Sequence, residues 1–374
     1  MDRTDAMTWL LSTCAVTMRQ SQAKTLVALV AAAMHCKRIS LANLGRRMGG
    51  MALVKHRIKR VWRFIANDRI EPSVAIGGVV ERLLAKHPRK RPVLVSFDWT
   101  DIRGMQTLMA AANIKGRAIP LCWASCHKHV YDGHRSRNAF EESLLMMLRQ
   151  MIPMHVKVIV LADRGFGRTE LGRFCQRMNL HYVIRIQGKV RVKFHGEDVR
   201  LDHYPVGKGR SERLDRVIYR ARSKHPLTQH VVIRWKKALP KRRDEPWYLM
   251  TDLPRQEGWT AIRTSDLYGR RMDIEQLFRD GKNKRAGWSL RDTGIERPDR
   301  LDRLILVLAL AYLLLMGVAL IAQDRFNPRH WSSNRRTDSA SLFTIGQWML
   351  ETVGLRGLIT AVQQQLVHQV PNWG

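Results

Sequence analysis

The chain has 374 residues, and its 65 lysines and arginines outnumber 32 acidic residues, which gives a formal net charge of +33. This excess is larger than solubility requires and predicts a polyanionic partner, with nucleic acid favoured over an anionic membrane surface. A hydrophobic content of 45% excludes a disordered basic tail and predicts one large folded domain or two to three smaller ones.

Residues 1–90 are predicted to form a helical DNA-binding domain. Ser40 precedes a short helix over residues 41–48, a Gly-Gly pair ends that helix, and residues 54–65 form the next one. A short helix, a glycine turn and a basic helix together resemble a helix-turn-helix DNA reader. A basic helical bundle that contacts only phosphates explains the same spacing nearly as well.

The basic helix of this domain carries the cations from which a DNA interface is predicted. Lys55, Arg57 and Lys59 spread positive charge over its surface. Ile58, Trp62 and Ile65 are expected to pack inward and to hold the helix on the domain.

Residues 91–187 are predicted to form the first part of a catalytic α/β domain. Strands and helices are expected in the order strand, strand, strand, helix, strand, helix, strand, over residues 91–98, 105–112, 118–125, 138–152, 156–163, 169–179 and 181–186. This succession is that of a ribonuclease H-like mixed sheet. Asp98 and Asp163 are each expected to end an apolar strand.

The remaining chain divides into three predicted parts. Residues 188–260 have strand-like runs separated by Pro and Gly, which predicts a β-rich insertion. Residues 261–325 are predicted to return to the catalytic domain, and residues 326–374 to form a C-terminal helical tail. The run 304–322 is apolar enough to cross a bilayer. Because it is a single segment with basic residues on both sides, a buried core helix is the favoured interpretation.

The cysteines indicate no disulfide framework, since five in 374 residues are too few for one. Cys122, Cys126, His129 and His134 resemble a zinc-ligand spacing. The first cysteine lies in a strand-like run and the spacing is compressed for a zinc finger, so a structural metal here stays a minor alternative.

Four polar residues, Tyr268, Arg271, Glu275 and Lys282, recur at offsets 0, +3, +7 and +14. On one helix at about 100° per residue, they fall within an arc of roughly 60°. A carboxylate among an aromatic ring, a guanidinium and an ammonium group suits a site that holds a metal ion beside a phosphate backbone. For this helix taken alone, a solvated face with an Arg–Glu ion pair is the stronger alternative.

Asp98, Asp163 and Glu275 come from three distant parts of the chain. Two-metal phosphoryl transfer needs such carboxylates, converging from rigid elements on two hard cations about 3.5–4 Å apart. A strand-terminal Asp taken alone is more often a turn former or a helix cap. Two such residues beside the polar helix make a metal-dependent site the favoured hypothesis.

On these motifs the chain resembles the DDE transposases of bacterial insertion sequences, and in particular the insertion-sequence-four family with its motif Y-x2-R-x3-E-x6-K. The four residues from Tyr268 to Lys282 match this motif without a gap, and Asp98 and Asp163 match the two aspartate blocks of the family. The Lys-His-Arg-Ile-Lys-Arg run and the Glu-Pro-Trp247 segment are most similar to the subgroup of the Tn-ten element. The likeness covers roughly residues 25 to 325.

The resemblance implies a cut-and-paste enzyme that uses two Mg²⁺ ions per active site, for which Mn²⁺ substitutes. Its implied partners are double-stranded DNA, as transposon ends with terminal inverted repeats and as target, and a second copy of the chain in a synaptic homodimer. Nicking, hairpin formation, hairpin opening and strand transfer follow. A bacterial cytoplasmic, nucleoid-associated protein without a membrane partner is expected.

The resemblance also implies a role for each site residue. Asp98, Asp163 and Glu275 are the implied catalytic metal ligands. The residues implied to contact the phosphates around the cleaved end are Tyr268, Arg271 and Lys282.

Trp247 is implied to stack on a flipped base, with packing against a neighbouring sheet as the equal alternative. Arg164 either touches DNA or pairs with a nearby carboxylate. Asp101 is expected to point away from Asp98 and to be structural. Two other functions stay open: an end-binding regulator without cleavage, and a ribonuclease H-like nuclease without strand transfer.

Overall fold

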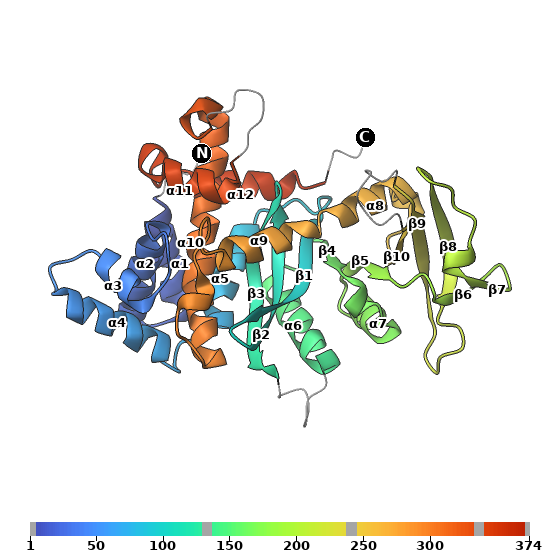
Figure 1. Cartoon of the computed structure of the whole chain (residues 1–374), viewed down its shortest axis with the longest axis horizontal. Coiled ribbons are helices and arrows are strands. Elements are labelled where there is room, and N and C mark those ends of the chain that lie inside the picture. The colour runs from blue at the N-terminus through green and yellow to red at the C-terminus, as the bar shows by residue number, and fades with distance from the viewer. Residues whose placement is uncertain (1–4, 129–136, 237–244, 333–339, 371–374) are drawn as a thin grey trace.

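The structure is a computed structural model, which describes residues 5–128, 137–236, 245–332 and 340–370. A twisted sheet runs through its middle, with a bundle of N-terminal helices at one end and a strand-rich lobe at the other (Figure 1).

The N-terminal bundle contains five helices within the described residues: α1 (Ala6–Thr17), α2 (Gln20–Met34), α3 (Leu41–Arg47), α4 (Val54–Ala66) and α5 (Pro72–Leu84). The predicted short helix and basic helix correspond to α3 and α4. Ser40 caps α3, because its Oγ accepts a hydrogen bond from the backbone N–H of Asn43 at 3.0 Å. The two helices cross closely at Gly45, where a Cβ would come within 2.6 Å of the Ile58 backbone.

The inward face of α4 differs from the predicted one. Trp62 is 52% exposed, and the Arg300 guanidinium lies over its ring at 5.4 Å from the centroid. Val61, Phe64 and Ile65 are buried instead. These three positions have the i, i+3, i+4 spacing of a helical stripe, and Trp62 lies about 100° away from Val61. The expectation for Ile65 is confirmed and that for Trp62 is wrong.

The described strands form one ten-stranded sheet of mixed direction. They are β1 (Val93–Ile102), β2 (Met105–Ile114), β3 (Arg117–His127), β4 (Val158–Ala162), β5 (His181–Ile186), β6 (Arg191–Phe194), β7 (Glu197–Arg200), β8 (Ser211–Tyr219), β9 (Leu227–Arg234) and β10 (Trp247–Thr251). Their order is β3-β2-β1-β4-β5-β10-β9-β8-β6-β7. The neighbours β1, β4 and β5 are parallel, and all other pairs are antiparallel.

The predicted order of elements up to β5 is confirmed. Two helices connect the strands, α6 (Arg137–Met151) after β3 and α7 (Thr169–Arg177) after β4. One detail is wrong, since Asp98 lies in the middle of β1 and does not end it. The antiparallel hairpin with β2 extends β1 to Ile102, whereas its parallel pairing with β4 stops at the pair Phe97 and Ala162.

The β-rich segment after β5 extends the same sheet. Strand β10 pairs with β5 on one side and with β9 on the other, so β6 to β10 continue the sheet as one surface. The segment then leads into α8 (Ala261–Gly269) and α9 (Met272–Lys282). These helices cross the central strands in Figure 1.

The long apolar helix α10 (Pro298–Arg325) is a core helix. Its most apolar window is 94% buried inside the fold, which confirms the prediction of a buried helix. It packs against the N-terminal helices α2, α4 and α5 and against β3, with α11 (Leu342–Val353) and α12 (Leu358–Val367) alongside. At Gly317 a Cβ would come within 2.7 Å of Leu358, so the small residue allows α12 to lie directly on α10.

All five cysteines are buried free thiols. Cys122 and Cys126 lie in β3 and donate to the carbonyls of Leu144 (3.9 Å) and Gln106 (3.7 Å). The two histidines of the predicted zinc spacing, at positions 129 and 134, lie outside the described residues. A structural metal at these four residues therefore stays an untested alternative.

Asp302 on α10 gives a first test of the fold, because its Oδ1 is buried although the residue as a whole is half-buried. Its Oδ2 accepts a hydrogen bond from the Ser125 backbone, and its Oδ1 has no partner among the described residues. Burial raises the pKa of Asp302 to about 7 from an ordinary value of 3.8. The folded state therefore keeps a proton that the unfolded state loses. The free energy of unfolding should fall as pH rises from 4 to 7, by at most about 1.4 kcal/mol per unit.

We expect Asp302→Asn to flatten this slope and to raise the free energy of unfolding at pH 8 by roughly 2 kcal/mol. Urea unfolding at pH 5 and pH 8 measures both effects. The exposed residue Asp68 supplies the control substitution, Asp68→Asn. An equal pH slope in wild type and Asp302→Asn would contradict the assignment.

Candidate active site

Asp98 lies in β1, and Asp163 directly follows the end of β4, the parallel neighbour of β1. Phe97 of β1 is paired with Ala162 of β4, and each aspartate is the next residue along its strand. Neighbouring strands are about 4.8 Å apart, and residues in register point to the same face of a parallel pair. The two carboxylates therefore emerge together at the carboxyl end of β4.

The turn after β4 holds Asp163 in place. Its Oδ1 accepts a hydrogen bond from the Gly165 backbone N–H at 2.8 Å, which caps a short 3₁₀ turn over Arg164–Phe166. A Cβ on residue 165 would come within 3.1 Å of that oxygen. The glycine therefore leaves room for the carboxylate beside the turn.

Arg271 connects Asp98 to Glu275. Its Nη1 lies 3.2 Å from Asp98 Oδ2, and its Nη2 donates to Glu275 Oε1. The side chain of Arg271 is largely buried, whereas 40% of the Glu275 side chain is exposed. One guanidinium therefore draws a carboxylate from β1 and a carboxylate from α9 toward the same point.

The electrostatics of Asp98 show that the three carboxylates share one neighbourhood. Burial raises the pKa of Asp98 to about 6, Arg271 opposes this increase, and the charges of Asp163 and Glu275 add to it. Three carboxylates that repel one another in a partly buried site are stabilised by a cation among them.

The spacing predicted that the four polar residues of the motif lie on one helix, and this prediction is wrong. Helix α8 ends at Gly269 and α9 begins at Met272, with Arg270 and Arg271 in the turn between them. Tyr268 therefore belongs to α8, and Glu275 and Lys282 belong to α9. Backbone hydrogen bonds of the i to i+3 type span this turn, which is tighter than an α-helix.

Tyr268 is buried and packs edge-on against Trp247 at the start of β10, with 5.2 Å between ring centroids. The ammonium of Lys236 lies 4.6 Å from the Trp247 ring centroid. Burial raises the pKa of Tyr268 to about 12, Arg271 and Arg185 lower it, and Asp163 raises it. Trp247 is half-buried, so it has both the packing contact and an accessible part.

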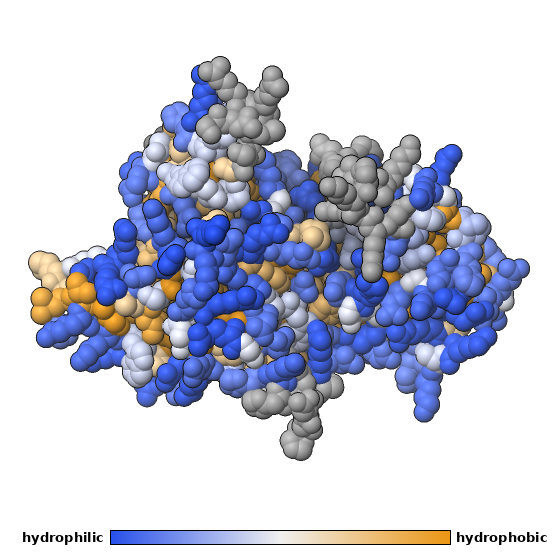
Figure 2. Space-filling view, in the orientation of Figure 1, coloured by the Kyte–Doolittle hydropathy of each residue, from blue (hydrophilic) through white to orange (hydrophobic). Residues whose placement is uncertain are grey.

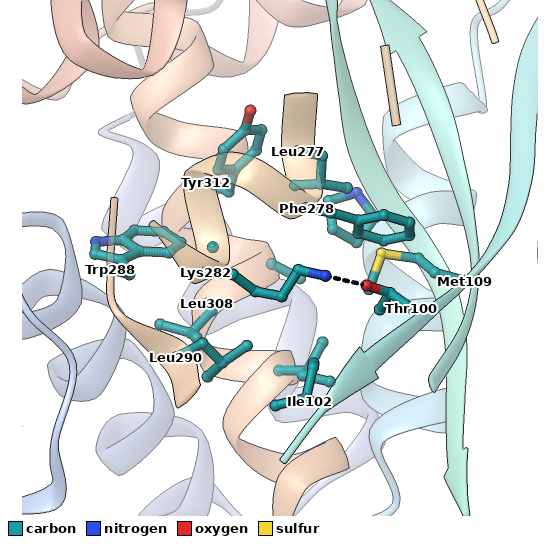
Figure 3. A pocket seen from close by; sticks show the side chains of 14 residues that line it. Thr100, Ile102, Met109, Leu277, Phe278, Lys282, Trp288, Leu290, Leu308 and Tyr312 are labelled. Atoms are coloured by element: carbon teal, nitrogen blue, oxygen red, sulfur yellow. Dashed lines mark hydrogen bonds between the residues drawn. The ribbon is translucent and has the colours of Figure 1, made fainter. Parts of the chain in front are cut away.

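Lys282 reaches back to β1 from the end of α9. Its Nζ donates to Thr100 Oγ1 at 2.7 Å, across the pocket drawn in Figure 3. Apolar side chains of the pocket surround the aliphatic part of the lysine (Figure 3). Burial lowers the pKa of Lys282, Arg291 lowers it further, and Asp101 and Asp98 raise it.

Two further predicted residues lie at the edges of this site. Arg164 is exposed directly after Asp163, and its side chain has no ion pair within the described part of the chain. Asp101 is also exposed, and its carboxylate accepts hydrogen bonds from Gly104 N–H (3.2 Å) and Gln106 Nε2 (2.9 Å). Asp101 therefore stabilises the β1–β2 turn, which confirms the structural interpretation.

The cations of α4 fall into two groups. Lys55 and Lys59 are exposed, whereas Arg57 is half-buried and donates from Nη1 to the Met48 carbonyl at the end of α3. The turn before α4 also exposes apolar side chains, including Met51 and Leu53. Figure 2 shows this apolar tip at the left edge of the molecule, among hydrophilic residues.

The polar face of β1 was missed as a unit. Ser96, Asp98 and Thr100 alternate with Phe97 and Trp99, so the three polar residues point to one side of the strand. Asp98 is linked to Arg271, and Thr100 to Lys282. Strict alternation in the sequence Ser-Phe-Asp-Trp-Thr was the signal that could have identified Thr100.

The donor set has the chemistry of a divalent-metal site. Carboxylate oxygens suit Mg²⁺ and Mn²⁺, and Asp98 and Glu275 already share one cationic group, the Arg271 guanidinium. Within the described ranges no three acidic, His or Cys side chains converge closely enough to hold one ion. The three acids would therefore have to come closer together than they lie here to hold one ion.

Comparison with known proteins supplies the class. The family model described as the transposase DDE domain matches residues 89–314, which is more than half of the chain. The chain therefore belongs to the DDE transposases, a family of DNA-binding enzymes that transfer DNA phosphoryl groups with divalent metals. A search of curated proteins finds no significant match.

Proposed function

We propose that the protein is a cut-and-paste transposase that binds the terminal inverted repeats of its element and moves it into target DNA. The observation that carries this proposal is that the Arg271 guanidinium joins Asp98 to Glu275, while Asp163 follows the strand that pairs with the strand of Asp98, all inside the segment that matches the DDE family. Two Mg²⁺ ions, for which Mn²⁺ substitutes, supply activation of the attacking oxygen and stabilisation of the leaving oxygen.

The residues of the chain have separate roles in this proposal. Asp98, Asp163 and Glu275 are the catalytic metal ligands. Arg271 passes from the carboxylates to a phosphate oxygen when DNA binds, because a guanidinium pairs with either anion through the same planar N–H groups. Tyr268 and Lys282 bind neighbouring phosphates, and Arg164 contacts the same DNA strand from its exposed position.

The finer assignments belong to the same proposal. Residues 91–187 and 261–325 form a ribonuclease H-like catalytic domain that residues 188–260 interrupt, and residues 1–90 form the DNA-binding domain. Residues 326–374 are the C-terminal helical tail. Membership of the insertion-sequence-four family and its Tn-ten subgroup rests on the motif Y-x2-R-x3-E-x6-K. The active form is a homodimer on paired ends, and the protein acts on the bacterial nucleoid.

An excision assay tests the proposal. Purified protein is incubated with DNA that carries both ends of the element and with Mg²⁺, and hairpin ends, released element and joined products are followed on gels. We expect all three. A gel shift without any break would identify an end-binding regulator, and cutting without joined products would identify a nuclease without strand transfer.

Replacement of Trp247 tests the hairpin step. We expect Trp247→Ala to leave the first nick within about threefold of wild type and to slow hairpin formation by roughly tenfold to a hundredfold. Stacking on a flipped base is worth about 1–3 kcal/mol. Trp247→Phe keeps a ring and should recover most of the rate. Equal losses at both steps would indicate that Trp247 serves only to pack on Tyr268.

Replacement of exposed cations on α4 tests the DNA interface. We expect Lys55→Ala with Lys59→Ala to weaken end binding and to reduce the slope of log affinity against log salt by roughly 0.9 per lost phosphate contact. Arg57→Ala is the comparison variant, because Arg57 donates to Met48 within the protein. It should lower thermal stability and retain most of the slope. An unchanged slope in the double variant would remove α4 from the interface.

A further inference from the structure

A buried polar network lies beside the candidate site and is separate from its proposed ligands. Its centre is Asn113 at the end of β2, whose side chain is fully buried. Asn113 Oδ1 accepts a hydrogen bond from Ser96 Oγ at 3.0 Å. Its Nδ2 donates to the Arg270 carbonyl at 2.6 Å and to Asp273 Oδ2 at 3.1 Å. One amide therefore joins β1, β2 and the turn between α8 and α9.

The position of Ser96 relates this network to the site. Ser96 lies two residues before Asp98, on the same face of β1. Along that face, Ser96 is joined through Asn113 to the α8–α9 turn, and the next residue on the face, Asp98, is joined to Arg271. Ser96 and Asp98 follow one another along this face of β1, and the residues to which they are joined, Arg270 and Arg271, follow one another along the chain. The first contact therefore helps to place the second.

A second buried carboxylate fixes α9 on the same side. Asp280 lies one heptad after Asp273, and its Oδ2 accepts from Arg117 Nε at 2.7 Å and from the Tyr312 hydroxyl at 2.8 Å. Residues seven apart face the same way on a helix. Two polar contacts at 273 and 280 therefore set the rotation of α9 more sharply than apolar packing does, because an unpaired buried carboxylate is costly.

The backbone of Asn113 is held as well. Gln369, beyond α12, donates from Nε2 to the Asn113 carbonyl, and its Oε1 accepts from the Leu94 backbone N–H at 2.7 Å. The Gln369 amide thus bridges β1 and β2 just beyond their last paired residues, Val95 and Ala112. Both the side chain and the backbone carbonyl of Asn113 are therefore held by hydrogen bonds.

We propose that Asn113 is a positioning residue for the DDE site, because it holds the α8–α9 turn at the point from which Arg271 and Glu275 reach Asp98. This inference rests on the proposed function for the identity of the site. Asn113 touches neither DNA nor a reacting atom. It acts through the Arg270 carbonyl and Asp273, which hold the first turn of α9, and Glu275 lies in that turn.

The test compares Asn113→Ala with a control of equal burial. Gln229 on β9 is also buried, and its Oε1 accepts from the Tyr182 hydroxyl at 2.9 Å without involving α8 or α9. Both variants are measured at a temperature at which circular dichroism shows them folded. Mn²⁺ affinity without DNA, end-binding affinity and the first-nick rate at saturating DNA are recorded.

We expect Asn113→Ala to weaken Mn²⁺ binding and to slow the nick by roughly tenfold to a hundredfold each, a loss of the size seen when groups that orient metal ligands are removed. End binding should stay within about threefold of wild type. Gln229→Ala should lose stability and keep its Mn²⁺ affinity. Wild-type Mn²⁺ affinity and nicking in Asn113→Ala would overturn the inference. Failure of the proposed function is distinct, since then the wild-type protein itself does not nick.

A charge exchange keeps the inference testable if Asn113→Ala does not fold. Asn113→Asp places a carboxylate against Asp273, which should reduce Mn²⁺ affinity more than Asn113→Ala does. Adding Asp273→Asn restores a donor between the two side chains and should recover at least tenfold of that loss. Losses that simply multiply in the double variant would show that the two residues are not coupled, and would also overturn the inference.

Discussion

Replacing Asp98 by asparagine should reduce DNA cleavage by about a thousandfold or more while leaving end binding largely intact. Asp98 is a metal ligand under the proposed function. Loss of one such ligand removes several kcal/mol of transition-state stabilisation, and each 1.36 kcal/mol is a factor of ten in rate. Asp163→Asn and Glu275→Gln should have the same effect. Binding should persist, because the exposed cations that are proposed to contact phosphates are unchanged.

The matched control is Asp101→Asn, three residues further along the same strand. Asp101 is exposed and accepts hydrogen bonds within the β1–β2 turn, so this variant should cut at close to the wild-type rate. A single-turnover nicking assay with Mg²⁺ and a gel-shift titration measure the two properties. If Asp98→Asn, Asp163→Asn and Glu275→Gln all still cut, the site assignment is wrong.

Replacing Arg271 by alanine should change metal binding and cleavage in opposite directions. The guanidinium contacts both Asp98 and Glu275, and under the proposed function it would compete there with a divalent ion. Its removal should tighten Mn²⁺ binding by roughly tenfold, since two partly buried carboxylates lose their counterion. Cleavage should fall by about a hundredfold to a thousandfold, because the phosphate loses its charged hydrogen-bond donor.

Arg279→Ala is the control for this experiment, because Arg279 is an exposed arginine of the same helix. It should alter neither property by more than about threefold. Arg271→Lys keeps the charge and loses the planar fork that contacts two carboxylates at once, so we expect it to lie between wild type and Arg271→Ala. Weaker Mn²⁺ binding in Arg271→Ala would show that the guanidinium organises the carboxylates and does not compete with metal.

The two experiments separate the roles of neighbouring residues. A metal ligand and its competitor both reduce cleavage when replaced, but only the ligand reduces metal affinity. Replacing a positioning residue such as Asn113 should lower Mn²⁺ affinity and cleavage, as replacing a ligand does, but by a smaller factor. Measuring both Mn²⁺ affinity and nicking rate for each variant therefore shows whether its residue is a metal ligand, a competitor of the metal or a positioning residue.

Local features were predictable from the sequence because their causes are local. Ser40 before α3, the apolar run that became β4 and the turn glycine after Asp163 each act within a few residues, and the structure contains all three elements. The candidate carboxylates were also identifiable, because residue types and spacing carry the chemistry. Their assignment as metal ligands stays a prediction.

Long-range pairing could not be predicted in the same way. The position of Asp98 within β1 depends on how far the β2 hairpin extends past the end of β4. The exposure of Trp62 depends on which stripe of α4 meets the rest of the bundle. The position of Asp98 and the exposure of Trp62 both depend on contacts between different segments. The pattern of apolar residues within one segment does not specify those contacts.

The sequence by itself determined the class of chemistry, through three acids, a basic partner surface and the spacing from Tyr268 to Lys282. Only the tertiary structure decided that α8 and α9 are separate helices and that Arg271 spans Asp98 and Glu275. The physical reason is that these features depend on contacts between distant segments, such as the hydrogen bonds from the buried amide of Asn113 to the Arg270 carbonyl and to Asp273. Such a contact exists only once β2 and the helix pair are packed together.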